Sequence, residues 1–142
     1  MSRAASICGQ KMGLWQRKLW RLRDQTGNRR AAAEHNAKVE GVSERVELVD
    51  ADARDLPFPA NSFDVVVSNL TFDNIHGTEE RARALREVVR VLVPSGRMCI
   101  VDDRADRYAA VLRMAGCSDV EVRRLDWRTS AFPAIIWCLS PP

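Results

Sequence analysis

The sequence lacks several features that would assign the protein to a large functional class. No apolar run approaches the length of about 18 residues that a membrane-spanning helix needs. The four cysteines form no CxxC pair and no Cys/His ligand spacing, which argues against a zinc site. Scattered free thiols are typical of a reducing compartment. We therefore expect a cytoplasmic protein with no membrane span and no bound metal.

Acidic residues are nearly absent from the start of the chain. The first 30 residues contain eight lysines and arginines and one acid, whereas the remainder contains fourteen basic residues and eighteen acids. Residues 11–23 place Trp15, Leu19 and Leu22 at helical spacing. We predict a separate basic segment over residues 1–23, with an amphipathic helix as one form. A transit peptide, a helix that binds a membrane surface or nucleic acid, and a solvated tail are the alternatives. The mildly acidic remainder does not favour a nucleic-acid partner.

The apolar pattern after the basic segment predicts alternating strands and helices in one domain, residues 24–142. Strands are expected at 46–49, 65–67, 97–103, 120–127 and 132–139, and helices at 29–40, 78–92 and 104–115. Asn28 and Thr78 are predicted helix caps, Gly41 a left-handed stop, and Pro94–Gly96 a tight turn. The last two strands are joined by too short a turn for a crossover helix, so they are antiparallel. The predicted fold is a doubly wound α/β sheet, mostly parallel, that ends in an antiparallel hairpin.

Polar side chains follow two of the expected strands. Asp50, Asp52 and Asp55 follow the first strand, and Ser68 and Asn69 follow the second. In an open α/β sheet the carboxyl ends of the strands border the ligand crevice. We therefore expect these side chains to face one shared site.

Five motifs in register resemble the core of class I S-adenosylmethionine-dependent methyltransferases. They are Asp52-Ala53, Leu56–Phe58, Phe63–Val66, Leu85–Leu92 and Pro94-Ser95-Gly96. The segments DQTGN and EHNAKVEGV also resemble a subgroup in which DQSGN follows an acidic strand end. The resemblance covers the chain from about Leu19 to the C-terminus. It implies a Rossmann-like fold, S-adenosylmethionine as the cofactor, and methyl transfer to a small molecule.

The resemblance also implies roles for residues at the two strand ends. In this family the acid after the third strand, with its small neighbour, lies against the adenine, and a carboxylate can accept the exocyclic N–H. Asp52 and Ala53 occupy those positions. The residues that end the fourth strand flank the methionine part of the cofactor, and Asn69 and Leu70 occupy those positions.

Asp73 and His76 are the candidates for a catalytic base. Both lie in the expected loop Thr71–Gly77. Displacement at a sulfonium methyl depends largely on positioning, so no base is demanded. The subgroup has His-Asn-Ile where this chain has Asp73-Asn74-Ile75, so the role has passed to Asp73 or has disappeared. A histidine and an aspartate in a loop are more often simply part of a polar surface.

Two departures from the family fall in the basic segment. The family's first strand is followed by an acidic-x-Gly-x-Gly-x-Gly loop, and the seven glycines of this chain include no GxG pair. That loop lets the backbone approach the cofactor closely, which a larger side chain would prevent. Lys18 stands where the family has the acid that binds the ribose hydroxyls, and a cation cannot accept those hydrogen bonds. The expected fold is therefore an incomplete Rossmann-like methyltransferase fold, whose first strand–helix unit was lost or replaced through a late start or a frameshift.

The loss of that unit leaves structural and functional alternatives open. Either the basic segment fills the gap in the sheet, or the domain is weakly stable, or a homodimer forms over the open edges. The function is that of a methyltransferase in truncated or degenerate form, or that of a non-catalytic methyltransferase-like remnant serving as an interaction module.

Overall fold

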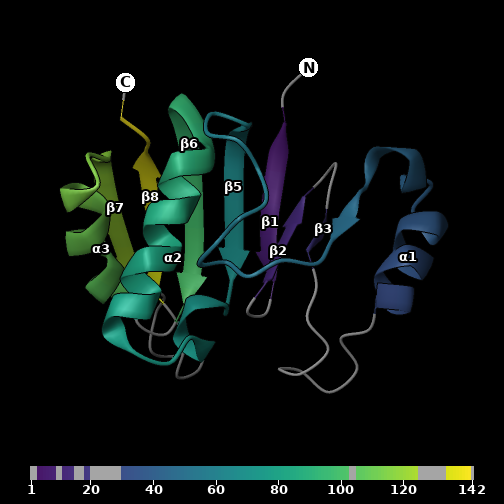
Figure 1. Cartoon of the computed structure of the whole chain (residues 1–142), viewed down its shortest axis with the longest axis horizontal. Helices are drawn as coiled ribbons and strands as arrows, with labels where there is room; N and C mark the ends of the chain where they lie inside the picture. The colour runs from purple at the N-terminus through teal and green to yellow at the C-terminus, as the bar shows by residue number, and fades with distance from the viewer. Residues whose placement is uncertain are drawn as a thin grey trace.

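A single mixed β-sheet organises the residues that the structure describes. The computed structural model describes residues 3–8, 11–14, 18–19, 30–102, 105–124 and 134–141. Within these ranges eight strands form one sheet in the order β4-β3-β2-β1-β5-β6-β8-β7 (Figure 1). The strands are β1 (Ala4–Cys8), β2 (Lys11–Leu14), β3 (Lys18–Leu19), β4 (Leu48–Val49), β5 (Phe63–Asn69), β6 (Leu92–Asp102), β7 (Ser118–Arg124) and β8 (Ala134–Leu139). The helices are α1 (Arg30–Val39), α2 (Thr78–Val91) and α3 (Ala105–Met114), with short 3₁₀ helices η1 (Ser43–Arg45) and η2 (Phe72–Asn74).

The C-terminal half of the sheet follows the sequence prediction. β5 and β6 pair in parallel, with Val67 opposite Cys99. β8 then lies antiparallel to both β6 and β7, so the last two strands form the predicted antiparallel pair. The predicted fold class, an α/β sheet with parallel strands and a C-terminal antiparallel hairpin, is confirmed.

The N-terminal strands fill the gap that the sequence comparison left in the sheet. β1 pairs in parallel with β5, with Ala4 opposite Val65. β1, β2 and β3 then form an antiparallel meander, and β3 pairs in parallel with β4. Of the three structural alternatives, the structure has the filled gap, while homodimer formation stays a prediction.

The amphipathic helix expected over residues 11–23 is wrong at two segments. Lys11–Leu14 and Lys18–Leu19 are strands. A short isolated helix is marginally stable in water, whereas β1 on one side and β4 on the other offer unpaired backbone groups to extended segments. Pairing with the sheet therefore outweighs the helical spacing of the apolar residues. The other residues of the basic segment, and the predicted boundary at residue 24, lie outside the described residues, so that boundary stays a prediction.

Local chemistry explains where α1 ends. Its alanine-rich sequence favours a helix. Gly41 has φ +64°, the Gly41 amide donates to the carbonyl of Lys38 (3.1 Å), and the Val42 amide donates to that of Ala37 (2.8 Å). This is a Schellman ending, and it confirms the predicted stop at Gly41. Asn28, the predicted cap, lies outside the described residues.

The boundaries of α2 differ from the prediction at both ends. Gly77, not Thr78, is the N-cap residue, and Thr78 is the first residue of the helix. The expected turn Pro94–Gly96 is part of β6, which begins directly after α2 and carries an irregularity opposite Asp64. A Cβ atom on Gly96 would approach the carbonyl oxygen of Val93 to 2.8 Å, so the close backbone contact in this bulge requires glycine.

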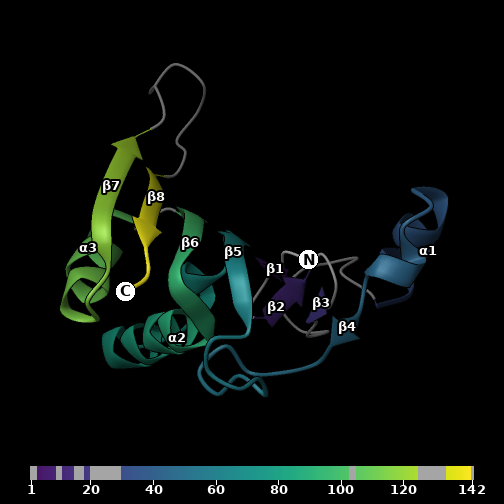
Figure 2. The same ribbon diagram turned by 90° about the horizontal axis from the view of Figure 1, so that it is seen from above.

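The hydrophobic core lies between one face of the sheet and the helices α2 and α3. Figure 2 shows both helices on the same side of β5, β6 and β8, with α1 at the far edge beyond β4. Val66, Met98, Ile100 and Ile136 from the sheet are fully or almost fully buried together with Leu85, Val88 and Leu112 from the helices. On the opposite face, Trp137 is 48% exposed. None of the helices in the described ranges is long and apolar enough to span a membrane.

Candidate functional site

The carboxyl ends of β4 and β5 lie at the same edge of the sheet. β4 is parallel to β3, and β1 is parallel to β5, while the two antiparallel steps from β1 to β3 restore the direction. The residues that follow β4 and β5 therefore share the edge at which ligands bind in open α/β sheets. Three strands separate β4 from β5 within the sheet.

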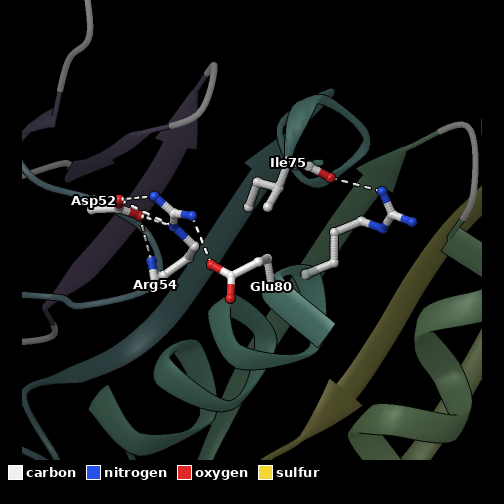
Figure 3. Close-up of polar contacts among 5 residues, drawn as sticks. Asp52, Arg54, Ile75 and Glu80 are labelled. Atoms are coloured by element: carbon white, nitrogen blue, oxygen red, sulfur yellow. Dashed lines mark hydrogen bonds and ion pairs between the residues drawn. The ribbon is translucent and has the colours of Figure 1, made fainter. Parts of the chain in front are cut away.

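Asp52, in the loop after β4, forms an ion pair with Arg54 (Figure 3). Arg54 Nε donates to Asp52 Oδ1 (2.9 Å) and Nη2 donates to Oδ2 (2.6 Å), so the guanidinium contacts both carboxylate oxygens. Nη1 of Arg54 donates to Oε2 of Glu80 in the first turn of α2 (2.7 Å). The hydrogen bond that Arg54 donates to Asp52 is the main cause that raises the pKa of Arg54. Arg54 thus connects the loop after β4 to the start of α2.

The next part of this loop is held by the C-terminal half of α2. The Leu56 amide donates to Glu87 Oε2 (2.9 Å), and Arg90 donates to the carbonyls of Phe58 (2.8 Å) and Leu56 (3.1 Å). Glu87 and Arg90 also pair with each other at 2.7 Å, and this hydrogen bond lowers the pKa of Glu87. These contacts join the motif at Leu56–Phe58 to the helix motif that contains Glu87 and Arg90.

The turn after β5 begins with a residue in an unusual backbone conformation. Asn69 is the exposed last residue of β5, and Leu70 has φ +49°. A left-handed leucine costs on the order of 1–3 kcal/mol and persists only where its surroundings hold it. The Leu70 amide donates to the carbonyl of Val101 (2.8 Å), and the Leu70 carbonyl accepts from Nδ2 of Asn74 (2.9 Å). The predicted methionine-side residue is therefore a strained position, and strain of this kind clusters at functional sites.

β1 contributes directly to this turn. Thr71 is fully buried, and its hydroxyl lies 3.2 Å from the carbonyl oxygen of Ile7 and 3.1 Å from that of Asn69. On the other side, Arg81 Nη1 donates to the carbonyl of Ile75 (2.7 Å; Figure 3). The turn is thus held by a strand on one side and by α2 on the other.

Asp102, at the end of β6, contacts the turn after β5 with its side chain. Its side chain is fully buried, and Oδ2 accepts from the amides of Phe72 (2.9 Å) and Asp73 (3.2 Å). Among the described residues, Asp102 Oδ1 and the hydroxyl of Tyr108 are buried without a hydrogen-bonding partner. Burial is the main cause that raises the pKa of Asp102, and burial together with the charge of Asp102 raises the pKa of Tyr108.

The sequence-predicted residues fall into two groups in the structure. Asp52 lies half exposed in the loop after β4, with Ala53 fully buried beside it, and Asn69 and Leu70 end β5. Asp73 is half buried in η2 rather than in an irregular loop, and His76 is exposed ahead of α2. Ser68, expected after the strand, lies inside β5 and is buried. Lys18 is in β3, opposite Leu48.

The sequence prediction missed Arg54, Glu80, Asp102 and Tyr108. Arg54 stands between two aspartates, a pattern that signals a local ion pair. Asp102 was assigned to the strand 97–103, and an acid at the end of an apolar strand is a signal for a buried or functional carboxylate. Tyr108 gives no sequence signal, because its position depends on how α3 packs against η2, where its ring lies 5.8 Å from that of Phe72.

The fold is that of the S-adenosylmethionine-dependent methyltransferases. An S-adenosylmethionine-dependent methyltransferase from Methanosarcina mazei has a similar structure, with TM-score 0.61 and 18% identity, covering 82% of this chain and 79% of that one. PigF with S-adenosylhomocysteine is similar with TM-score 0.58 and 16% identity over 82% of this chain and 41% of that one. The [4+2]-cyclase SpnF is also similar, with TM-score 0.63 and 22% identity over 78% of this chain and 62% of that one.

The sequence places the chain within a family. A family described as Methyltransferase domain matches residues 20–100, and the chain belongs to this family. S-adenosylmethionine is the cofactor of the methyltransferases that it resembles. The ubiquinone/menaquinone biosynthesis C-methyltransferase UbiE of Pseudomonas fluorescens is 45% identical over 62 residues, which is 44% of this chain and 23% of the relative. The UbiE of Azotobacter vinelandii is 42% identical over 62 residues, which again make up 44% of this chain and 23% of the relative. The chain thus spans less than a quarter of the length of these curated relatives.

Proposed function

We propose that this chain is an S-adenosylmethionine-dependent methyltransferase for a small molecule, in degenerate form, that retains the adenine side and the methionine side of the cofactor site. The observation that carries this proposal is the family match over residues 20–100, which includes both Asp52-Ala53 and Asn69-Leu70. The name of the UbiE relatives, which are C-methyltransferases of quinone biosynthesis, supports a small-molecule acceptor that is methylated on carbon.

The residues present fit the cofactor on one side only. Asp52 is a carboxylate with acceptor capacity for the adenine amino group, and Ala53 provides a small buried neighbour. Arg54 already contacts both oxygens of Asp52, so the adenine amino group must share or displace the guanidinium. Asn69 and Leu70 would flank the methionine side, and the hydrogen bonds that hold the turn after β5 support this proposal.

On the opposite side of the cofactor site, the chain lacks the glycine-rich loop that is typical of the family. β1 is followed by the antiparallel strand β2 with only residues 9 and 10 between them, where the family has a glycine-rich loop leading into a helix. Without that loop, backbone amides are not presented to the cofactor in the usual way. We therefore expect weaker binding than at a complete site.

The bound cofactor would supply a methyl group activated by the sulfonium charge. The chain's own contribution would be to orient the acceptor and, where the acceptor must lose a proton, to remove it. Of the two base candidates we favour Asp73, whose backbone amide donates to Asp102 and which is half buried, whereas His76 is exposed.

Calorimetric titration with S-adenosylhomocysteine tests the proposal. Saturable binding is expected, weakened at least about tenfold in Asp52→Ala because a charged hydrogen-bond acceptor is lost. Asp119→Asn, which neutralises an exposed carboxylate on β7, is the matched control and should bind like the wild-type chain. The absence of any binding heat at millimolar ligand would overturn the proposal.

The second candidate function is a non-catalytic interaction module with a methyltransferase-like fold. It is favoured by the lack of any GxG pair among the seven glycines and by the antiparallel strand that follows β1. Binding at micromolar concentration would exclude this alternative, because a chain that has lost the cofactor site should not retain such affinity.

A further inference from the structure

We propose that Asp102 is a positioning residue that holds the turn after β5 in its site-forming conformation. The proposal rests on the proposed function where it concerns the cofactor, because Asn69 and Leu70 are the methionine-side residues of that site. Asp102 itself touches neither of them through its side chain in the hydrogen bonds described, and acts on the turn through the amides of Phe72 and Asp73.

The hydrogen bonds place Asp102 at the centre of the turn. A single oxygen, Oδ2, accepts from two consecutive amides, those of Phe72 and Asp73. Consecutive amides that point to one oxygen fix the backbone between them, because both peptide planes must face the same point. The residue immediately before this pair is Thr71, and the one before that is the left-handed Leu70. Asp102 therefore restrains the segment whose backbone is strained.

The burial of Asp102 indicates that its carboxylate does more than fill space in the core. Asp102 is fully buried, and a buried carboxylate that served packing alone would be replaced at lower cost by an apolar side chain. Its second oxygen, Oδ1, has no hydrogen-bonding partner among the described residues. Buried polar groups are normally hydrogen-bonded, so a partly satisfied carboxylate calls for an explanation. The two amides of η2 are the groups that use it.

The charges around Asp102 make its hold on the turn dependent on pH. Asp73 from η2 faces it with a like charge, Tyr108 from α3 faces it with a hydroxyl, and Arg81 from α2 lies near Tyr108. Burial raises the pKa of Asp102 above the ordinary value of an aspartate, and the two amides oppose this rise. The ionised form accepts the stronger hydrogen bonds. Release of the two amides while Asp102 stays buried would raise its pKa further, because these amides lower it. The turn should accordingly loosen as pH falls through the pKa of Asp102.

Amide hydrogen exchange measured by NMR on the full chain tests this role without any acceptor substrate. In Asp102→Ala, the protection of the Phe72 and Asp73 amides should fall by about tenfold to a hundredfold, the range expected for a hydrogen bond to a charged acceptor. Asp102→Asn keeps one carbonyl oxygen and should restore part of the protection, but without its dependence on pH. Asp119→Asn should leave both the protection and its pH profile unchanged.

A second variant keeps the test valid where Asp102→Ala fails to fold. Tyr108→Phe retains the ring that packs against Phe72 and removes only the hydroxyl beside Asp102. A hydroxyl near a carboxylate favours its ionised form even where the two groups make no hydrogen bond of ordinary geometry. Loss of the hydroxyl should therefore raise the pKa of Asp102, and the loosening of the turn should move to higher pH in Tyr108→Phe. A wild-type protection that does not vary with pH, or an unshifted profile in Tyr108→Phe, would overturn the proposal.

Cofactor binding separates this proposal from the proposed function. If the wild-type chain binds S-adenosylhomocysteine, Asp102→Ala should weaken the binding severalfold and Asp102→Asn should restore most of it. Equal affinity in all three chains would contradict the positioning role and leave the methyltransferase function intact. If the wild-type chain does not bind, the proposed function fails, and the exchange experiment still decides the role of Asp102 in the turn.

Discussion

The two segments that form the candidate site are held in place by opposite means. The loop after β4 is tied to α2 by ion pairs of partly exposed side chains, with Arg54 at 36% and Glu80 at 41% exposure. The turn after β5 is held from inside the fold by the buried groups Asp102 and Thr71. One segment depends on charges that water and salt can screen, and the other on hydrogen bonds that they cannot reach.

This difference teaches which side of the site is rigid. A partly exposed ion pair contributes little to stability and exchanges readily with other partners. Arg54 can therefore leave Asp52 at low cost when another donor arrives. A buried carboxylate that loses its donors leaves an unpaired charge in the core, which is expensive. The methionine side of the proposed site is preorganised, and the adenine side is adaptable.

The largest effect in this comparison is expected from Phe72→Ala. Phe72 is fully buried in the turn after β5 and packs edge to face against Tyr108. Removal of such a ring should lower the free energy of unfolding by about 3–5 kcal/mol, measured by urea denaturation. A loss below about 1 kcal/mol would mean that the turn is not part of the core.

Glu87→Gln tests a contact of the loop after β4 that is more buried than the ion pairs of Arg54. Glu87 is only 19% exposed and accepts from both Arg90 and the Leu56 amide. We expect a loss of about 1.5–3 kcal/mol at neutral pH in urea denaturation. Because the pKa of Glu87 is lowered in the folded chain, its contribution is present above the ordinary value and is lost as pH falls through the lowered one.

The difference between wild type and Glu87→Gln should therefore shrink in acid. Glu79→Gln on the same helix is the control, since the Glu79–Arg86 pair is largely exposed, and it should cost much less. A difference that stays constant down to strongly acidic pH would contradict the ionic origin of this contact.

Thr71→Val tests whether β1 supports the turn. Valine keeps the shape of threonine and removes the hydroxyl that lies beside the carbonyls of Ile7 and Asn69. The expected loss is about 1 kcal/mol in the free energy of unfolding, the typical net value of one hydrogen bond. Thr71→Ser retains the hydroxyl and should recover that hydrogen bond at the cost of one methyl group. Equal stability of wild type and Thr71→Val would argue that β1 does not contact the turn.

The smallest effect is expected from Arg54→Gln. Because the side chains of Arg54, Asp52 and Glu80 are each about one third or more exposed, the loss should be about 0.2–1 kcal/mol. It should decline further at an ionic strength of about 1 M, where screening acts within a few ångströms. A large loss that is insensitive to salt would remove the contrast between the two segments.

Much of the fold was predictable from local patterns. The β-branched run at Val65–Val67 lies in β5, Gly41 ends α1, and the last two strands pair as an antiparallel hairpin. These features depend on side-chain shape and turn chemistry within a few residues. The strands β1 to β3 were not predicted, because β1 pairs with β5 and β3 pairs with β4, and both partners are distant in sequence.

The candidate site was predictable only in outline. The positions of Asp52 and Asn69 at strand ends follow from the pattern of the sequence, and their proposed roles come from the family resemblance. That Arg54 occupies both oxygens of Asp52, and that Asp102 reaches the amides of η2, depends on contacts between elements. The left-handed Leu70 was also unpredictable, because leucine has no preference for that conformation.

The position of β1 has a consequence for the order in which the chain folds. Ala4 pairs with Val65, so β1 joins the sheet only after a loop of about sixty residues has closed. The contacts between the loop after β4 and α2, by contrast, join residues 26 to 34 positions apart. Contacts over shorter separations form earlier on average. We expect the segment from the loop after β4 to β6 to assemble first, with β1 entering last and opening first, so that amides of β1 exchange with solvent faster than those of β6.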